Sequence, residues 1–230
     1  MSIDYDALKK RGFLRSKEDG VFTLRTRIAS GNYTGEHLEA ISRIAKKYGK
    51  GFTHLTVRQG IEIPFIRYED IDAVEKEIKD VGILPGASGP RLRATTVCPG
   101  NNWCKRGIVN TFALFEKIEN AGILCGLDLP HKFKIVISGC PNTCTRAQSS
   151  EIGLHGAADG KTIGYAVYLG GCGGRFPRIG FKLDKIFTED EAIDVIKKVI
   201  TFYKTHAKPR QRLALLIEQI GKESFLNAIQ

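Results

Sequence analysis

The chain has 230 residues, of which 42% are hydrophobic, and this is enough to bury a core in one or two compact domains. No apolar run of about 18 residues or more is present, and the start MSIDYDALKK lacks the apolar core of a signal peptide, so we expect a cytoplasmic protein that binds no membrane. The net charge of +10 would suit nucleic-acid binding, but the basic residues are scattered rather than clustered with aromatic residues, so we expect a small polyanion in a pocket and no nucleic acid.

Strand and helix patterns alternate in the first part of the chain. The predicted strands are VFTLRTRI (21–28), FTHLTV (52–57), IEIPFI (61–66) and RLRATTV (91–97), and the predicted helices are GEHLEAISRIAKKYG (35–49) and EDIDAVEKEIKDVG (69–82). The resulting order, β-α-β-β-α-β, is that of a ferredoxin-like α+β unit. The Gly- and Pro-rich loop LPGASGP marks a boundary before the last strand, so we predict domains at 1–85 and 86–230.

The second part is predicted to be a further α+β domain that ends in helices. Its predicted elements are the helix RGIVNTFALFEKIENAG, the strand KFKIVIS (132–138) and short strands around EIGLHG, TIGYAVYLGG and RIGFKL. Thr188 and Glu191 form a capping box that opens a helix ending near Tyr203, and PRQRLALLIEQIG is a second helix that Gly221 ends. Nothing in these terminal helices suggests chemistry, so we expect them only to pack.

The cysteines carry the strongest chemical signal. Four of the six form two clips, Cys98-x5-Cys104 and Cys140-x3-Cys144. A chain of this size without a secretory signal needs no disulfides, so metal ligation is the preferred interpretation. Four thiolates on wide loops suit a [4Fe–4S] cluster, and zinc, which usually takes tighter clips, is the alternative. Cys125 and Cys172 lie outside the clips, and we expect them to be small buried hydrophobic residues.

Two lysines precede the second clip on the predicted strand KFKIVIS. Lys132 and Lys134 stand at positions i and i+2, so their side chains point to one face of the strand while Phe133 faces the core. One strand can thus direct two ammonium groups at one anion. Lysines in a partly desolvated pocket have lowered pKa values and can donate protons as well as hold an anion. The alternative is a pair of surface cations.

Both clips lie in segments that resemble a known family signature. TVCPGNNWCKRGIVNT and KFKIVISGCPNTCTRAQSSEIGLHG resemble the signature of sulfite and nitrite reductases that couple siroheme to a [4Fe–4S] cluster. LRTRI, LTVRQGIEI and YEDIDAVEKEIKDVG resemble the ferredoxin-like half-domain of this family, so the resemblance covers residues 20–185. Full-size members have two such halves in one chain or in paired subunits. This chain has one of each part and resembles the low-molecular-weight, single-unit members.

The resemblance implies both cofactors and the residues that hold them. The implied cluster ligands are Cys98, Cys104, Cys140 and Cys144. Cys144 is also implied as the thiolate shared with the siroheme iron. Arg58 and Gln59 in TVRQG resemble the family's siroheme-contacting pair. Further implied partners of the siroheme carboxylates are Arg106, Arg146, Arg175 and Arg178.

The resemblance also implies a substrate site and a reaction. Two arginines and two lysines bind the anion and supply protons in the family, and the matching residues are Arg25, Arg93, Lys132 and Lys134, with Arg27 as a competitor to Arg25. The implied reaction is the six-electron reduction of sulfite to sulfide for assimilation. Nitrite reduction, or a non-catalytic siroheme and iron–sulfur electron-transfer protein, is the alternative. Electrons are expected from a partner such as an acidic ferredoxin, and the expected state is a monomer or a small homo-oligomer.

Overall fold

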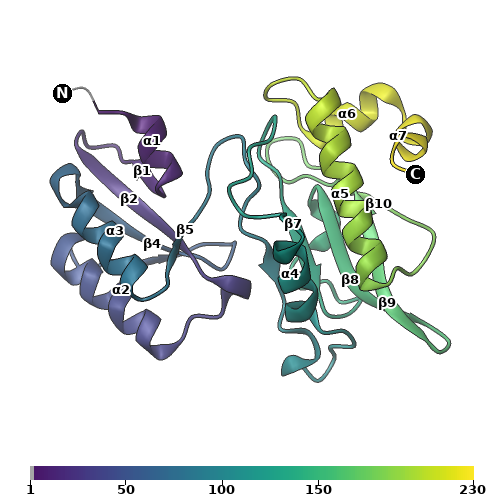
Figure 1. Cartoon of the computed structure of the whole chain (residues 1–230), viewed down its shortest axis with the longest axis horizontal. Helices are drawn as coiled ribbons and strands as arrows, with labels where there is room; N and C mark the ends of the chain where they lie inside the picture. Colours follow the sequence, from purple (N-terminus) through teal and green to yellow (C-terminus); the bar gives the residue numbers. More distant parts are fainter. Residues whose placement is uncertain (1–2) are drawn as a thin grey trace. The chain divides into compact units, whose positions relative to one another are not determined.

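The computed structural model of the protein describes residues 3–230, which divide between Gly89 and Pro90 into two compact units (Figure 1). We call the part before this point unit 1 and the segment Pro90–Gln230 unit 2. Within the described residues, no helix is long and apolar enough to span a membrane.

Unit 1 is an antiparallel sheet with helices packed on it. Its elements are α1 (Tyr5–Lys10), β1 (Phe13–Arg15), β2 (Val21–Arg27), the 3-10 turn η1 (Ala29–Gly31), α2 (Gly35–Tyr48), β3 (His54–Leu55), β4 (Ile61–Arg67), the 3-10 turn η2 (Tyr68–Asp70), α3 (Ile71–Asp80) and β5 (Leu84–Pro85). The strands follow the order β1-β2-β4-β3, and β5 also pairs with β2. The path β5-β2-β4-β3 has the order of a ferredoxin-like sheet, which confirms the predicted fold class of this part.

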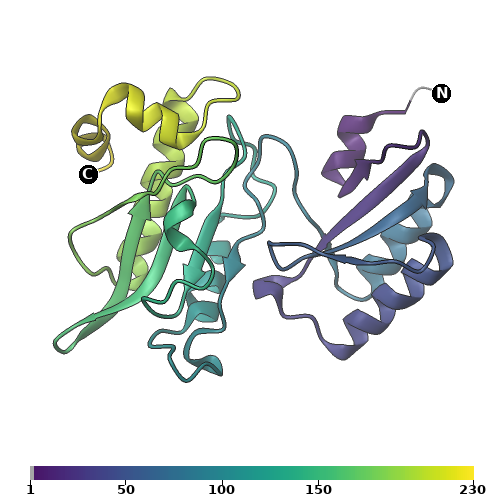
Figure 2. The same ribbon diagram turned by 180° about the vertical axis from the view of Figure 1, so that it is seen from behind.

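Apolar stripes on α2 and α3 build the core of unit 1. Both helices lie against the same sheet (Figures 1 and 2). Ile44 of α2 and Val74 of α3 are fully buried together with Ile63 of β4. The start of α2 is fixed by a capping box in which the Thr34 side chain accepts the N–H of His37, because the first turn of a helix leaves its N–H groups without partners.

The predicted closing strand of unit 1 is wrong. Leu84–Pro85 pairs with β2, whereas the segment predicted for this role, 91–97, contributes Thr96 and Val97 to the sheet of unit 2. A two-residue edge strand that contains a proline carries almost no local signal, and proline is tolerated at an edge. The short elements α1 and β1 were also not predicted.

Unit 2 consists of a mixed parallel and antiparallel sheet and helices, most of which follow the last strand. Its elements are β6 (Thr96–Val97), the 3-10 turn η3 (Gly100–Asn102), α4 (Thr111–Asn120), β7 (Ile135–Ser138), the 3-10 turn η4 (Ala147–Ser149), β8 (Ile152–Asp159), β9 (Thr162–Leu169), β10 (Phe181–Lys182), α5 (Glu189–His206), α6 (Leu213–Ile220) and α7 (Lys222–Ala228). The strand order is β10-β9-β8-β7-β6. The pairs β6-β7 and β7-β8 are parallel, and the others are antiparallel.

Helices α4 and α5 cover one face of this sheet (Figure 1), and Figure 2 shows the unit from behind. Leu114 of α4 and Ile196 of α5 are fully buried in one core with Ile137 and Leu154 of the strands. Thr188 and Glu191 form the predicted capping box of α5. The α+β class is therefore confirmed for this unit as well.

Candidate functional site

The two cysteine clips begin at the same edge of the unit 2 sheet. Cys98 directly follows β6, and Cys140 lies two residues after β7. These strands are parallel neighbours, and the Cys98 N–H donates to the Ile137 carbonyl at 2.9 Å. Because the carboxyl ends of parallel strands meet at one edge, the fold brings together two clips that are more than 30 residues apart in the sequence.

Glycines allow the backbones of the two clips to approach each other closely. A Cβ on Gly107 would lie 2.1 Å from the carbonyl carbon of Gly100, and a Cβ on Gly139 would lie 2.4 Å from the Gly100 Cα. Neither position has room for a side chain. The Ile108 N–H donates to the Gly139 carbonyl at 2.9 Å, so the two clips form one continuous backbone cradle.

The thiols of the clips fit an iron–sulfur cluster as a donor set. All are free, with Cys98 and Cys140 partly buried and Cys104 and Cys144 exposed. The Gly100 N–H lies 3.4 Å from Cys98 Sγ, and such N–H groups stabilise a cluster thiolate. Within residues 3–230, no group of three or more His, Cys, Asp or Glu side chains is close enough together to hold a single metal ion. A [4Fe–4S] cluster places each thiolate on a different iron and so suits wider spacing.

The two remaining cysteines differ from each other. Cys172 is buried, as expected, and its thiol lies 3.7 Å from the Phe176 carbonyl. Cys125 is only partly buried, so the expectation of a buried hydrophobic residue is wrong for it.

The two predicted lysines lie just before β7 rather than within it. Phe133 forms an isolated parallel bridge with Leu92 and is fully buried, whereas Lys132 and Lys134 are partly exposed. The backbone is extended here, because the Phe133 carbonyl accepts the Arg93 N–H at 2.9 Å. The predicted alternation of faces therefore holds although the strand is shorter, and the bridge places Arg93 next to the lysine segment.

The surroundings of Lys134 favour its neutral form. Burial lowers the pKa of Lys134, and the positive charges of Arg212 and Lys132 lower it further, against the opposing effects of Glu151 and Cys172. Its ammonium donates to the Ser149 carbonyl at 3.3 Å. A lysine with a lowered pKa gives up a proton more readily than a solvated one.

A cavity of about 200 Å³ lies beside Lys132, and we call it the basic cavity. Its lining includes the cationic or titratable residues His131, Lys132, Arg175, Arg178 and Arg212. Among the described residues that line it there is no carboxylate. Burial lowers the pKa of His131, and the charges of Arg212, Lys132, Arg93 and Arg210 lower it further. Arg178 and Arg212 form ion pairs with Glu218 and Glu151, neither of which lines the cavity, and the positive charge of the lining would attract an anion.

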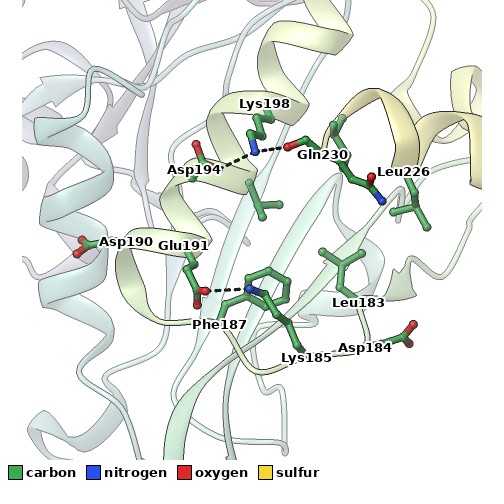
Figure 3. A pocket seen from close by; sticks show the side chains of 12 residues that line it. Leu183, Asp184, Lys185, Phe187, Asp190, Glu191, Asp194, Lys198, Leu226 and Gln230 are labelled. Atoms are coloured by element: carbon green, nitrogen blue, oxygen red, sulfur yellow. Dashed lines mark hydrogen bonds and ion pairs between the residues drawn. The ribbon is translucent and has the colours of Figure 1, made fainter.

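A second cavity, of about 830 Å³, lies between α5, α7 and the segment before α5 (Figure 3). Both lysines of its lining pair with carboxylates of the same lining: Lys185 with Glu191 at 2.8 Å, and Lys198 with Asp194 at 3.0 Å. Its mixed charges give no convergent positive field. The smaller basic cavity is therefore the better candidate for an anion, although it is less spacious.

The predicted siroheme arginines of unit 2 have different surroundings. Arg106, Arg146 and Arg175 are exposed. Arg178 donates to both carboxylate oxygens of Glu218, at 2.7 and 3.1 Å, and to the Phe176 carbonyl at 2.9 Å. A cofactor carboxylate at Arg178 would therefore have to replace Glu218.

The remaining predicted site residues belong to unit 1. Arg25 of β2 is partly buried, and its Nε and Nη2 both lie 2.7 Å from the Glu62 carboxylate on β4. Arg58 and Gln59 occupy the loop between β3 and β4, where Gln59 has φ +60°. The Thr56 hydroxyl stabilises this turn by accepting the N–H groups of Arg58 and Gly60.

Sequence reasoning missed Glu151 and Arg212. Glu151 precedes β8 and is fully buried, and Arg212 precedes α6 and lines the basic cavity. Arg212 lies within the segment predicted as the second terminal helix, so this segment also contributes a charged side chain to the lining of the basic cavity. The one available signal was a glutamate directly before the apolar segment IGL, where a buried charge needs a partner.

Family comparison defines the class of protein. The family described as "Nitrite and sulphite reductase 4Fe-4S domain" matches residues 88–230, and the "Nitrite/Sulfite reductase ferredoxin-like half domain" matches residues 15–81. The chain belongs to the siroheme and [4Fe–4S] sulfite and nitrite reductase family, which confirms the resemblance seen in its motifs. Siroheme and a [4Fe–4S] cluster are the cofactors of this family.

Individual relatives include both sulfite and nitrite reductases. The chain is 31% identical to the coenzyme F420-dependent sulfite reductase of Methanocaldococcus jannaschii, covering 100% of this chain and 44% of the relative. It is 28% identical to an assimilatory-type sulfite reductase of Nitratidesulfovibrio vulgaris, covering 95% and 97%. It is 30% identical to an NAD(P)H nitrite reductase of Emericella nidulans, covering 96% of this chain and 20% of the relative. The chain thus spans less than half of two of these relatives.

Solved structures share the fold. The dissimilatory sulfite reductase I structure matches with a TM-score of 0.81 at 17% identity, covering 91% of this chain and 69% of that one. The NirA protein of Mycobacterium tuberculosis matches with a TM-score of 0.85 at 19% identity, covering 96% and 45%.

Proposed function

We propose that this protein is a sulfite reductase that reduces sulfite to sulfide on a siroheme coupled to a [4Fe–4S] cluster. The observation that carries the proposal is the basic cavity beside Lys132, in the same unit as the cradle formed by both cysteine clips. The similarity to an assimilatory-type sulfite reductase over 97% of that relative's length supports the same substrate.

The cysteines of the two clips are proposed to hold the cluster, with Cys144 shared with the siroheme iron. Siroheme, when bound, supplies the iron on which the sulfur atom accepts electrons. Proposed partners of the siroheme carboxylates are Arg58, Gln59, Arg106, Arg146, Arg175 and Arg178. Exposed arginines suit this role because their guanidinium groups bind carboxylates through two parallel hydrogen bonds.

The proposed work of the cations is to hold the anion and to supply protons. Arg93 and Lys132 would bind the sulfite oxygens, because a guanidinium keeps its proton and an ammonium offers three donors. Lys134 would donate a proton to an oxygen of the bound anion, since its surroundings lower its pKa. Arg25 is proposed as the fourth cation, and for this it would have to exchange its Glu62 partner for the anion.

Nitrite is the second candidate substrate, because a nitrite reductase is 30% identical over 96% of this chain. Both are small oxyanions that the same cations can bind. We further propose that a separate cytoplasmic donor such as a ferredoxin supplies the electrons, since a net charge of +10 would attract an acidic partner.

The experiment is anaerobic turnover with a reduced viologen dye and with sulfite or nitrite in turn. The proposal predicts sulfide from sulfite with a higher kcat/KM than ammonium from nitrite. A preference for nitrite would replace the proposed substrate. Absence of turnover on both anions, in protein with the full siroheme spectrum, would favour the non-catalytic electron carrier.

A further inference from the structure

A buried ion pair contacts the backbone of Lys134. Glu151 is 0% exposed and Arg212 is 9% exposed. The Arg212 Nε donates to Glu151 Oε1 at 2.8 Å, and Nη2 contacts the same oxygen. The other oxygen, Oε2, accepts the backbone N–H of Lys134 at 2.9 Å. One carboxylate therefore links the residue before α6 to the backbone of a lysine that the proposed function uses.

Lys134 is held at its other polar groups as well. Its carbonyl accepts the N–H of Ile152 at 3.1 Å, and its ammonium donates to the Ser149 carbonyl at 3.3 Å. A Cβ built on Gly173 would lie 3.9 Å from Lys134 Nζ, and Gly173 lines the basic cavity. The ammonium is therefore close to the wall of the basic cavity.

Arg212 also contacts this wall of the basic cavity. It lines the basic cavity, and its Nη1 lies 3.4 Å from the Gly173 carbonyl. A single guanidinium thus contacts both Glu151 and Gly173, the glycine near the Lys134 ammonium.

Stability alone does not account for such a pair. Burying two charges costs about as much desolvation free energy as their attraction returns, so apolar residues of the same size often stabilise a fold equally well. We propose that Glu151 and Arg212 are positioning residues for Lys134, because the pair fixes the lysine backbone and balances the charge beside its ammonium at the wall of the basic cavity. Its catalytic consequence rests on the proposed function, whereas the charge balance does not.

Because Glu151 and Arg212 carry opposite charges, the proposal predicts that replacing one lowers the pKa of Lys134 and replacing the other raises it. Glu151 and Cys172 raise the pKa of Lys134, and Arg212 and Lys132 lower it, in addition to burial. Glu151→Gln should therefore lower this pKa, and Arg212→Met should raise it. Glu75→Gln is the matched control, since Glu75 forms an ion pair with Arg11 in unit 1.

The first test needs no turnover. Competitive amine labelling of the holoprotein across a pH series, read at Lys134 by mass spectrometry, measures where this amine becomes reactive. Relative to wild type, the midpoint should move to lower pH in Glu151→Gln, to higher pH in Arg212→Met, and not at all in Glu75→Gln. Equal midpoints in wild type and both site variants would overturn the proposal.

The second test reads catalysis. With unchanged cofactor spectra, Glu151→Gln and Arg212→Met should lower kcat for sulfite by about tenfold to a hundredfold, with KM changed much less, as expected when a proton donor is misplaced. Arg212→Lys keeps the charge but not all the contacts, so its kcat should lie between wild type and Arg212→Met. A wild-type kcat in Arg212→Lys and Glu151→Gln would overturn the positioning role.

The two tests separate this inference from the proposed function. If wild type turns over neither sulfite nor nitrite, the proposed function fails, and the labelling midpoints still decide the charge balance. If Glu151→Gln or Arg212→Met does not fold, Arg212→Lys decides, because a wild-type kcat in that variant contradicts the proposal and a several-fold loss at unchanged KM supports it.

Discussion

Lys134 differs from Lys132 in what surrounds it, although the two are only two positions apart. Lys134 contacts the Ser149 carbonyl and has a lowered pKa, whereas Lys132 lines the basic cavity. We therefore expect different kinetic roles, with Lys132 contributing mainly to anion binding and Lys134 mainly to proton transfer.

Replacing each lysine by alanine should separate these roles. Lys134→Ala should lower kcat by about 10²–10⁴, the usual loss for a general acid, and Lys132→Ala should mainly raise KM for sulfite. The siroheme absorption should remain in both, which steady-state kinetics and a visible spectrum of the same samples can check. Normal sulfite turnover in both variants would support the alternative interpretation, in which both lysines are only surface cations. Lys161→Ala, an exposed lysine of the turn between β8 and β9, serves as the control.

The pH dependence follows from the direction of the Lys134 shift. A lowered pKa means that this lysine loses its proton at a lower pH than a solvated lysine, and only the protonated form can donate. Turnover should therefore fall as the pH rises through this pKa, below the ordinary lysine range. Lys134→Arg should lack this basic limb, because arginine does not deprotonate. A wild-type profile with its basic limb at the pH of free lysine would contradict the assignment.

At the scale of elements, the parallel strands β6 and β7 decide which cysteines can share a cluster. Serine at Cys98, Cys104, Cys140 or Cys144 should each reduce bound iron, since each thiolate would hold one iron of the cluster. Serine at Cys125 or Cys172 should leave the iron content unchanged. Iron and acid-labile sulfide per chain measure this directly. Loss of iron with Cys172→Ser and retention with Cys104→Ser would refute the ligand set.

The contact between the clips should also depend on Gly107. A Cβ there would lie 2.1 Å from the carbonyl carbon of Gly100, so Gly107→Ala must displace the backbone of the first clip. We expect a loss of about 1–3 kcal/mol in the free energy of unfolding and a lower iron content. Gly35→Ala is the control, because no atom lies within 4 Å of its added Cβ and the position is helical. If both variants unfold at the same temperature as wild type, the contact between Gly107 and Gly100 is not tight.

Sequence patterns correctly predicted the elements that depend on residues close in the sequence. The apolar stripes of α2 and α3 and the caps at Thr34 and Thr188 act within a few residues, so they were recognised. β5 has two residues and owes its pairing to β2, which no local pattern encodes. The pair between Glu151 and Arg212 joins positions 61 residues apart and depends on how α6 returns to the sheet.

At the scale of the whole molecule, the predicted substrate cations are divided between the units. Arg93, Lys132 and Lys134 belong to unit 2, where the isolated bridge between Leu92 and Phe133 brings their segments together. Arg25 belongs to unit 1 and is paired with Glu62. The lysine alternation was predictable because it has the period of an extended chain, whereas the hydrogen bond from Arg93 to the lysine segment and the basic cavity arise only from the fold.

Family membership assigns the cofactors. The proposed reaction can be tested by measuring how many electrons are consumed for each sulfide formed. Reduction of sulfite to sulfide takes up six electrons, which a one-electron viologen dye delivers one at a time. The decisive measurement is the ratio of reduced dye consumed to sulfide released, under anaerobic conditions, by protein of known siroheme and iron content. A sulfite reductase predicts six equivalents of dye for each sulfide, and protein with both cofactors that forms no sulfide from sulfite would contradict the proposal.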